Sequence, residues 1–437
     1  MQTNLLSSEK ITPLVIKMAF PIMISMGVQA FYNIADSLFI SHFSEVAFAG
    51  VSLVQPLLMI VMALANGIGA GCGSQLSKAL GSDNEELGKR CVGTAFFLTL
   101  AVTVLSSVLV LLIAYPFATS STSNEVAQNA AFTYLLIITP TFVLSGVNAI
   151  ITFDLQSHAR PKSAMLVQTS GAIVNIILDP ILIFSCGMGV AGAALATSIG
   201  YLVSFLVSIY LYIKLPLTKA KPMFDKECSH VIFNIALPNM MAQGAGPIVG
   251  LVFNKLVVAY SIEALAILGM YLKAESFMFL ASSGIASALI VIVGYNYGMG
   301  DYSRVKKSFK VSLVMSWSIM LLGFIIFELF TPYIVALFTS DKELIQMGIP
   351  MFRTLCLCFL LTSPNIIMTG LLQGLGKGKE SLMITYFRFF ICLIPIAFIT
   401  NHFIGLLGVC MSYFLADIPT IFLIIAIYRK VSKTMLK

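Results

Sequence analysis

Charged side chains stand inside strongly apolar stretches of this sequence. They are Asp36, Asp154, Asp179, Glu275, Glu328, Asp417, Lys255, Lys273, Arg353 and Arg388. An ionised side chain near the centre of a bilayer costs at least about 2.5 to 3.5 kcal/mol, so each of these residues needs a partner or water. Carboxylates in such surroundings hold cations or protons, which makes the acidic members the first candidates for chemistry.

Four polar residues of the first half are predicted to lie at one depth. Taking about 1.5 Å of helix rise per residue, Asp36, Asp179 and Thr197 fall at similar levels in the outer leaflet. Asn175 precedes Asp179 by one helical turn and shares its face. The set Asp36, Asn175, Asp179 and Thr197 offers only oxygen and amide ligands, which suit a proton or a hard cation such as Na⁺. Two carboxylates in one poorly solvated pocket repel, which favours a bound proton or cation.

Simpler roles are open for the two aspartates. Asp179 could be a satisfied polar residue that stabilises a proline kink, and Asp36 could extend to the outer surface of the membrane. The motif "NIILDPILIF" places Pro180 after Asp179, where the missing N–H leaves the carbonyl of Ile176 free beside the carboxylate. Pro21 lies on the same predicted helix as Asp36 and is a second candidate hinge. Pro238, in the second half, indicates that this proline could also be architectural.

A second group of charges lies near mid-depth in the second half. Lys273, Glu275, Arg353 and Asp417 are candidates for a polar wall of a substrate cleft. Internal ion pairs that hold helices in register are the alternative. The glycines of "NGIGAGCG" indicate a close-packing helix face rather than a binding loop. No phosphate-binding loop, nucleophile and base pair or metal-ligand cluster is recognisable, so we expect no enzyme, no ATP site and no cofactor beyond a coupling ion, H⁺ or Na⁺.

The composition is that of a membrane protein. The 437 residues include 58% hydrophobic and 10% charged residues, with a mean hydropathy of +0.96, whereas soluble domains carry about 25% charged residues. Apolar stretches long enough to cross about 30 Å of hydrocarbon recur throughout. The predicted spans are residues 13–41, 47–78, 91–117, 128–156, 163–186, 189–214, 230–259, 263–297, 308–333, 344–373, 380–401 and 405–429.

Lys and Arg alternate between the loops of the two sides. One side carries nearly all of them, from Lys78, Lys89 and Arg90 to Arg429, Lys430 and Lys433, and the other side only Lys342. The positive-inside rule then predicts that both termini are cytoplasmic. The net charge of +7 reflects this topology, and its division among alternate loops argues against nucleic-acid binding. We expect a multi-pass monomer of the cytoplasmic (inner) membrane, in contact with membrane lipids.

The sequence contains two copies of one unit. A shift of 217 positions aligns Ala19-Phe20-Pro21 with Ala236-Leu237-Pro238, Gly67-Ile68 with Gly284-Ile285, Gly81 with Gly298, Lys89 with Lys306, Asn148 with Asn365, Leu155-Gln156 with Leu372-Gln373 and Lys162 with Lys379. Six spans per half predict parallel repeats related by a pseudo-twofold axis along the membrane normal. We therefore expect an N-terminal six-helix lobe at 1–215, a cytoplasmic linker at 216–229 and a C-terminal lobe at 230–437. Phe253 and Ile396 stand where Asp36 and Asp179 repeat, which predicts a cation site in the first lobe alone.

Four segments resemble the multidrug and toxic compound extrusion (MATE) family, in its bacterial DinF-like and MepA-like branch. They are "NIADSLFISHFSEVAFAGVSLVQP", "SKALGSDNEELGK", "NIILDPILIF" and "GVAGAALATSIG". The resemblance covers nearly the whole chain and implies the MATE fold. It also implies a secondary antiporter that expels bulky, often cationic and lipophilic drugs in exchange for H⁺ or Na⁺. In members with a first-lobe cation site, the matching ligands fall here on Asp36, Asn175, Asp179 and Thr197. Other branches use acids of helices 7 and 10, where this chain has Lys255 and Arg353.

Rival functions share parts of this pattern. Two lobes around a cleft predict alternating access, and the intramembrane charges that differ between the halves favour a transporter over a channel or scaffold. A flippase for a lipid or a lipid-linked sugar shares the two-lobe plan. Such proteins often carry extra spans or a strongly basic cleft, and neither is evident in the sequence.

Overall fold

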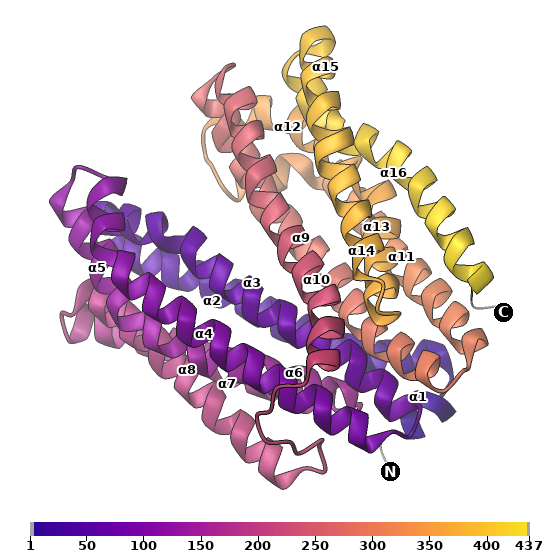
Figure 1. Ribbon diagram of the computed structural model, residues 1–437. Helices are drawn as coiled ribbons and strands as arrows, with labels where there is room; N and C mark the ends of the chain where they lie inside the picture. Colours follow the sequence, from indigo (N-terminus) through magenta and orange to yellow (C-terminus); the bar gives the residue numbers. More distant parts are fainter. Residues whose placement is uncertain (1–3, 435–437) are drawn as a thin grey trace. The chain divides into compact units, whose positions relative to one another are not determined.

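The computed structural model describes residues 4–434, and each of the elements within that range is a helix (Figure 1). The outermost residues, to which the prediction of cytoplasmic termini applies, lie outside the described range. Among the described residues, eleven helices are long and apolar enough to cross a membrane, and a bent helix pair supplies a twelfth span. The prediction of an all-α membrane protein with twelve spans is confirmed.

The first half of the chain, coloured from indigo to magenta in Figure 1, contains six of these spans. Polar loop residues begin three of its helices, because the side chains of Ser44, Asn84 and Asn124 accept hydrogen bonds from backbone N–H groups of the first turn. The elements are α1 (Asn4–Ser8), α2 (Ile11–Phe43), α3 (Glu45–Gly81), α4 (Glu85–Ser121), α5 (Glu125–Ile138), η1 (Thr139–Thr141), α6 (Phe142–Ser157), α7 (Pro161–Pro180), η2 (Ile181–Ser185) and α8 (Gly189–Lys214).

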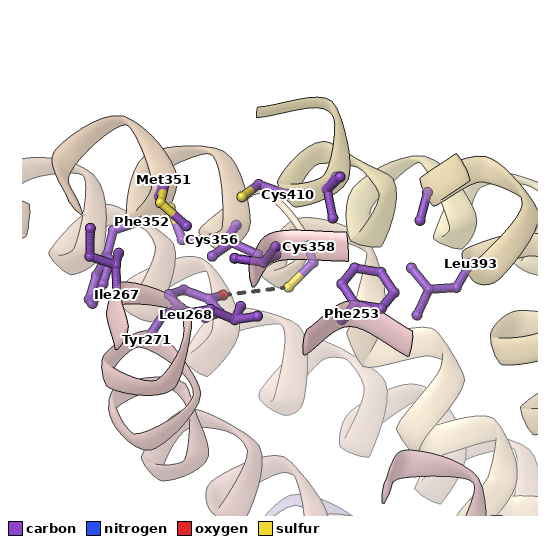
Figure 2. Packing of buried hydrophobic residues seen from close by; sticks show 14 of the residues in the cluster. Phe253, Ile267, Leu268, Tyr271, Met351, Phe352, Cys356, Cys358, Leu393 and Cys410 are labelled. Carbon is purple, nitrogen blue, oxygen red and sulfur yellow. Dashed lines mark hydrogen bonds between the residues drawn. The ribbon is translucent and has the colours of Figure 1, made fainter. Parts of the chain in front are cut away.

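The second half repeats this order of spans. Its elements are α9 (Lys226–Val258), α10 (Ile262–Gly298), α11 (Tyr302–Ala336), α12 (Lys342–Cys356), α13 (Phe359–Gly374), α14 (Gly378–Tyr386), η3 (Phe387–Leu393), α15 (Ile394–Ile404) and α16 (Leu406–Thr434). Helices α12 and α13 form the broken span, with a bend of 45°. Tyr271 packs against Phe352 and Phe359 in the apolar core of this half. Its hydroxyl lies 3.8 Å from the Cys358 thiol (Figure 2).

The glycine-rich stretch of α3 is a packing face. A Cβ atom on Gly69 would lie 2.5 Å from the ring of Phe153 on α6, and one on Gly73 would lie 3.0 Å from the same ring. Only a residue without a side chain allows this approach. The predicted close-packing role of "NGIGAGCG" is confirmed.

The chain folds as two compact units, with one border inside α2, at Ala19/Phe20, and another inside α9, at Met240/Met241. The first unit contains Phe20–Met240 together with the residues up to Ser8, and the second contains Glu9–Ala19 and Met241–Lys437. Helix α2 therefore begins in the second unit and continues in the first, and α9 begins in the first unit and continues in the second.

The segment between α8 and α9 packs within the first unit. The backbone N–H of Met223 donates to the carbonyl of Gly93 on α4 (3.1 Å), and the hydroxyl of Tyr212 on α8 donates to the carbonyl of Thr218 (3.1 Å). Nε of Arg90 on α4 donates to Oδ2 of Asp225 (2.9 Å). The predicted linker, residues 216–229, thus lies within the first unit and is attached to it along its length.

Candidate cation site

Asp179 lies where helix α7 changes its geometry. Pro180 ends α7, and a π-helical turn, η2, follows it directly. Proline lacks the N–H that would bond to the carbonyl four residues earlier, so the regular helical ladder is interrupted beside the carboxylate. π-Helical turns widen the backbone and are frequent at functional sites. The carboxylate is fully buried at this break.

Asn175 joins the acid of α7 to the hydroxyl of α8. Its Nδ2 donates to Oδ1 of Asp179 (3.3 Å) and to Oγ1 of Thr197 (3.2 Å). All three side chains are buried. Oδ1 of Asn175 and Oδ2 of Asp179 are buried acceptors that have no hydrogen-bond donor among the described residues. Buried acceptors of this kind cost free energy unless a cation, a proton or an ordered water satisfies them.

Asp36 on α2 belongs to the same cluster, although it makes no direct hydrogen bond with the other three predicted residues. It is 8% exposed, and its Oδ1 has no hydrogen-bond partner within residues 4–434. Asp36 and Thr197 line one cavity, and Asn175 links Thr197 to Asp179, so two charged carboxylates in this poorly solvated region would repel each other. A cation or proton bound among these groups would remove the repulsion.

Three tyrosines complete the cluster, and they were not among the residues predicted from the sequence. Tyr134 on α5 is buried and lines the same cavity as Asp36 and Thr197. Tyr32 on α2 and Tyr201 on α8 line the same cavity as Asp36. Two of them could have been predicted from helical spacing, because Tyr32 precedes Asp36 by one turn and Tyr201 follows Thr197 by one turn.

Two adjoining cavities of the first unit reach these residues. Asp36, Tyr134 and Thr197 line a cavity of about 360 Å³, and Asn175 and Thr197 line a second of about 140 Å³. Their shared lining is Gln29, Tyr32, Met62, Asn66, Thr197 and Tyr201. Asp36 is therefore open to the larger cavity, whereas Asp179 lines neither and lies behind Asn175. An ion that enters through the larger cavity meets Asp36 first.

In the second half, Asp417 pairs with an arginine. Nε of Arg388, within the π-helical segment η3, donates to Oδ1 of Asp417 on α16, and one terminal nitrogen donates to Oδ2 (3.3 Å). Thr362 on α13 donates to the same Oδ2 (2.7 Å) and accepts from the guanidinium (3.3 Å). All three side chains are buried. This carboxylate has a protein donor for each oxygen and an opposite charge beside it.

The structure does not bring the four predicted cleft residues together. Arg353 faces Glu328 instead, at 3.5 Å, with both side chains largely exposed. Lys273 is exposed and forms no ion pair within the described part of the chain. Glu275 is half-buried near Tyr271 and Arg388. The reason is helical geometry, because Lys273 and Glu275 are two residues apart and point in different directions from α10. The Arg353–Glu328 and Arg388–Asp417 pairs fit the alternative of internal ion pairing, and the predicted role of the four residues in a substrate cleft stays a prediction.

Comparison with known proteins points to one family. The MatE family model matches residues 21–181 and 238–399, two segments whose starts differ by 217 residues. The multidrug export protein MepA of Staphylococcus aureus (strain MRSA252) is 27% identical over 410 residues, covering 91% of this chain and 89% of that protein. MepA of Staphylococcus saprophyticus is 26% identical over 411 residues, with the same coverage. The crystal structure of MATE in complex with MaL6 has a TM-score of 0.94 and 24% identity, covering 99% of this chain and 98% of that one.

Proposed function

Because this chain belongs to the MatE family, we propose that it is a secondary active multidrug efflux antiporter that works by alternating access. It exchanges H⁺ or Na⁺ for bulky, lipophilic, often cationic compounds and so confers resistance to antibiotics. We place it in the cytoplasmic membrane with both termini inside. The two-lobe fold supports this mechanism, because parallel repeats of six spans are a common architecture of secondary transporters.

The observation that carries the proposal is the acidic cluster of the first lobe. Asp179 and Asn175 present two buried oxygens that have no donor among residues 4–434, and Asp36 presents a third. Oxygen ligands from carboxylate, amide and hydroxyl groups suit Na⁺, and two neighbouring carboxylates equally suit a proton. We assign ion binding to Asp36, Asn175, Asp179 and Thr197. The coupling ion is cargo of this site rather than a resident cofactor.

The coupling mechanism follows from the position of Asp36 on the cavity wall. An ion that reaches Asp36 from outside is passed to the buried oxygens of Asp179 and Asn175, and its charge stabilises helices α2, α7 and α8 against one another. Ion and drug then favour different states, and the coupling free energy can be no larger than the difference in the ion's binding free energy between those two states. Pro21 and Pro180 supply the bending points, since each removes a backbone hydrogen bond next to a helix of the cluster.

Drug binding is proposed for the larger cavity of the first lobe. Its volume of about 360 Å³ lies within the range of small-molecule sites, which run from about 300 to 1,000 Å³. Aromatic and amide side chains line it, including Tyr32, Tyr134 and Asn66, and they suit flat apolar rings that carry a few polar groups. Asp36 on the same wall favours a positive charge on the drug and makes drug and ion competitors.

Transport in proteoliposomes tests the proposal directly. Purified protein is reconstituted with ethidium, and a proton gradient and a sodium gradient are imposed one at a time. We expect saturable export that needs one of the two gradients, and we expect Asp36→Asn and Asp179→Asn to abolish it. Glu328→Gln is the matched control, because it neutralises a largely exposed acid of the second lobe. Full export by both Asn variants would falsify the coupling site. Lipid flipping without ethidium export would instead favour a flippase, and passive, non-saturable flux a channel.

A further inference from the structure

The predicted cytoplasmic ends of α11 and α16 form a groove that is separate from the cation site. Its volume is about 420 Å³, and Lys306, Lys307 and Lys310 of α11 line it. The rings of Phe309 and Tyr428 form an aromatic wall, with their centroids 5.0 Å apart and their planes 23° from parallel. The groove thus combines positive charge with a stacked apolar surface.

The three lysines lack negative partners. None of them forms an ion pair with a residue between positions 4 and 434, and Lys307 and Lys310 are exposed. They stand on the first turns of α11, where the apolar span gives way to a polar loop. Unpaired lysines beside aromatic rings at this level of a membrane protein match the chemistry of a lipid headgroup on the anionic leaflet.

In the first lobe, the start of α4 is equivalent to the start of α11. Asn84 and Asp301 cap α4 and α11 with the same hydrogen bond, to the backbone N–H three residues later, and they are 217 residues apart. The same shift relates Lys89 to Lys306, Arg90 to Lys307, and Gly93 to Lys310. The starts of these two helices can therefore be compared position by position.

In the first lobe a segment of the chain itself covers these positions. The linker lies against Gly93, where a Cβ atom would stand 2.6 Å from the carbonyl oxygen of Lys221. Its Asp225 accepts a hydrogen bond from Nε of Arg90, and its Ala220 N–H donates to the hydroxyl of Tyr212 on α8 (3.0 Å). The carboxylate of Asp225 and the side chain of Met223 thus lie together on the start of α4. No described residue brings a carboxylate to Lys307 within 4.0 Å.

We propose that the groove between α11 and α16 binds an anionic phospholipid. Its phosphate lies among Lys306, Lys307 and Lys310, where Asp225 lies against Arg90 in the first lobe. Its acyl chain follows the face of α11 on which Lys310, Leu313 and Trp317 succeed one another at helical spacing. Trp317 is 43% exposed and is the only tryptophan of the chain. It lies about 10 Å beyond Lys310 along the helix, which is acyl-chain depth.

Fluorescence quenching of Trp317 tests this. The full-length protein is reconstituted into vesicles of brominated phosphatidylglycerol or brominated phosphatidylcholine, each mixed with its unbrominated form. The ratio of the two relative binding constants at Trp317 reports headgroup preference. We expect a preference for phosphatidylglycerol of at least about fivefold, because each lysine near an anionic headgroup contributes about that factor. The preference should fall to about one in the triple variant K306Q/K307Q/K310Q.

Two further variants separate the groove from general surface charge. K306R/K307R/K310R should keep the preference, and so should K162Q/K377Q/K379Q, which removes three lysines from other predicted cytoplasmic loops. Equal binding of the two lipids by the unaltered protein overturns the proposal, as does an undiminished preference in the triple Gln variant. Loss of the preference in millimolar inorganic phosphate also overturns it, because the groove would then take a free anion rather than a lipid.

Discussion

The two lobes place buried acids in similar surroundings and balance their charge in opposite ways. In each lobe a π-helical segment interrupts the fifth span, η2 directly after Asp179 and η3 around Arg388. In each lobe a threonine from a neighbouring helix joins the polar cluster, Thr197 in the first and Thr362 in the second. Asp179 keeps an oxygen without a donor among the described residues, whereas both oxygens of Asp417 are satisfied by Arg388 and Thr362.

This difference in hydrogen bonding distinguishes an acid that is available to bind an ion from an acid that pairs with an arginine inside the protein. A carboxylate that already holds a guanidinium has no need of an external cation, and losing its partner leaves a buried charge uncompensated. A carboxylate that holds only an amide N–H can exchange a proton or a metal ion without loss of fold. On the proposed function, the first lobe carries the ion-binding acids and the second carries the buried Arg388–Asp417 pair, and substitutions in the two lobes can test that contrast.

The largest effect is expected from the acids of the first lobe. Asp36→Asn and Asp179→Asn each remove a charge that the coupling ion neutralises, so gradient-driven drug export should be abolished, which means a fall of at least about tenfold to the background level. Export from cells that produce each variant measures this, with membrane levels as the control. Thermal midpoints should stay close to that of the unaltered protein, because no protein cation is left unpaired. A strongly lowered midpoint would instead assign the two acids a structural role.

The opposite outcome is expected in the second lobe. Arg388→Met leaves Asp417 buried beside Thr362 alone, which should lower the free energy of unfolding by about 3 to 5 kcal/mol. The double variant Arg388→Met, Asp417→Leu removes both charges and should recover most of that loss. Thermal unfolding in detergent compares the two. Equal destabilisation by the single and double variants would show that the pair is not internally neutralised.

A smaller effect is expected from Thr197→Val. This change keeps the shape of the side chain and removes the hydroxyl that accepts from Asn175. A neutral hydrogen bond contributes about 1 kcal/mol, so the ion concentration at half-maximal export should rise by about fivefold. Ser198→Ala is the control, since the Ser198 hydroxyl donates to the backbone carbonyls of Ile137 and Ala194 rather than to the cluster.

The smallest effect concerns the linker. The backbone N–H of Cys228, and then the guanidinium of Arg90, hold the pKa of Asp225 below its ordinary value. A carboxylate whose pKa is lower in the folded state stabilises the fold above its unfolded pKa of about 3.9, and that contribution is lost as the pH falls through the folded pKa. The difference in thermal midpoint between the unaltered protein and Asp225→Asn should therefore be constant between pH 7 and pH 5 and shrink below about pH 4. Asp225→Asn should lower the midpoint at pH 7 and weaken the fall in acid. An unchanged acid profile would contradict the assignment.

Much of the fold was accessible from hydropathy and repetition, because crossing a bilayer requires about 20 apolar residues and parallel repeats preserve their spacing. Hydropathy reports length rather than contact, however. It therefore did not predict the bend between α12 and α13, the π-helical turns, or the helices shared between the two units. Attachment of the linker to Arg90 and Gly93 likewise depends on interactions between distant segments.

Some residues of the candidate site were likewise predictable from the sequence, and others were not. Depth and one-turn spacing grouped Asn175, Asp179 and Thr197, and the structure places these side chains in hydrogen-bond contact. Tyr134 carries no charge and comes from a helix with no other marker, so nothing in its surroundings singled it out. The pairing of Asp417 with Arg388 required knowledge of which helices meet, since both are isolated charges in apolar sequence.

Helices α2 and α9 each have residues in both units, so each unit includes a helical segment from the other half of the chain. The first turns of α2 are held in the second unit, where the guanidinium of Arg304 donates to the carbonyl of Glu9 (3.0 Å). Segment-swapped dimers exchange a segment between their two subunits in a similar way. Two fragments severed in the linker should consequently fold when produced together and fail when produced separately.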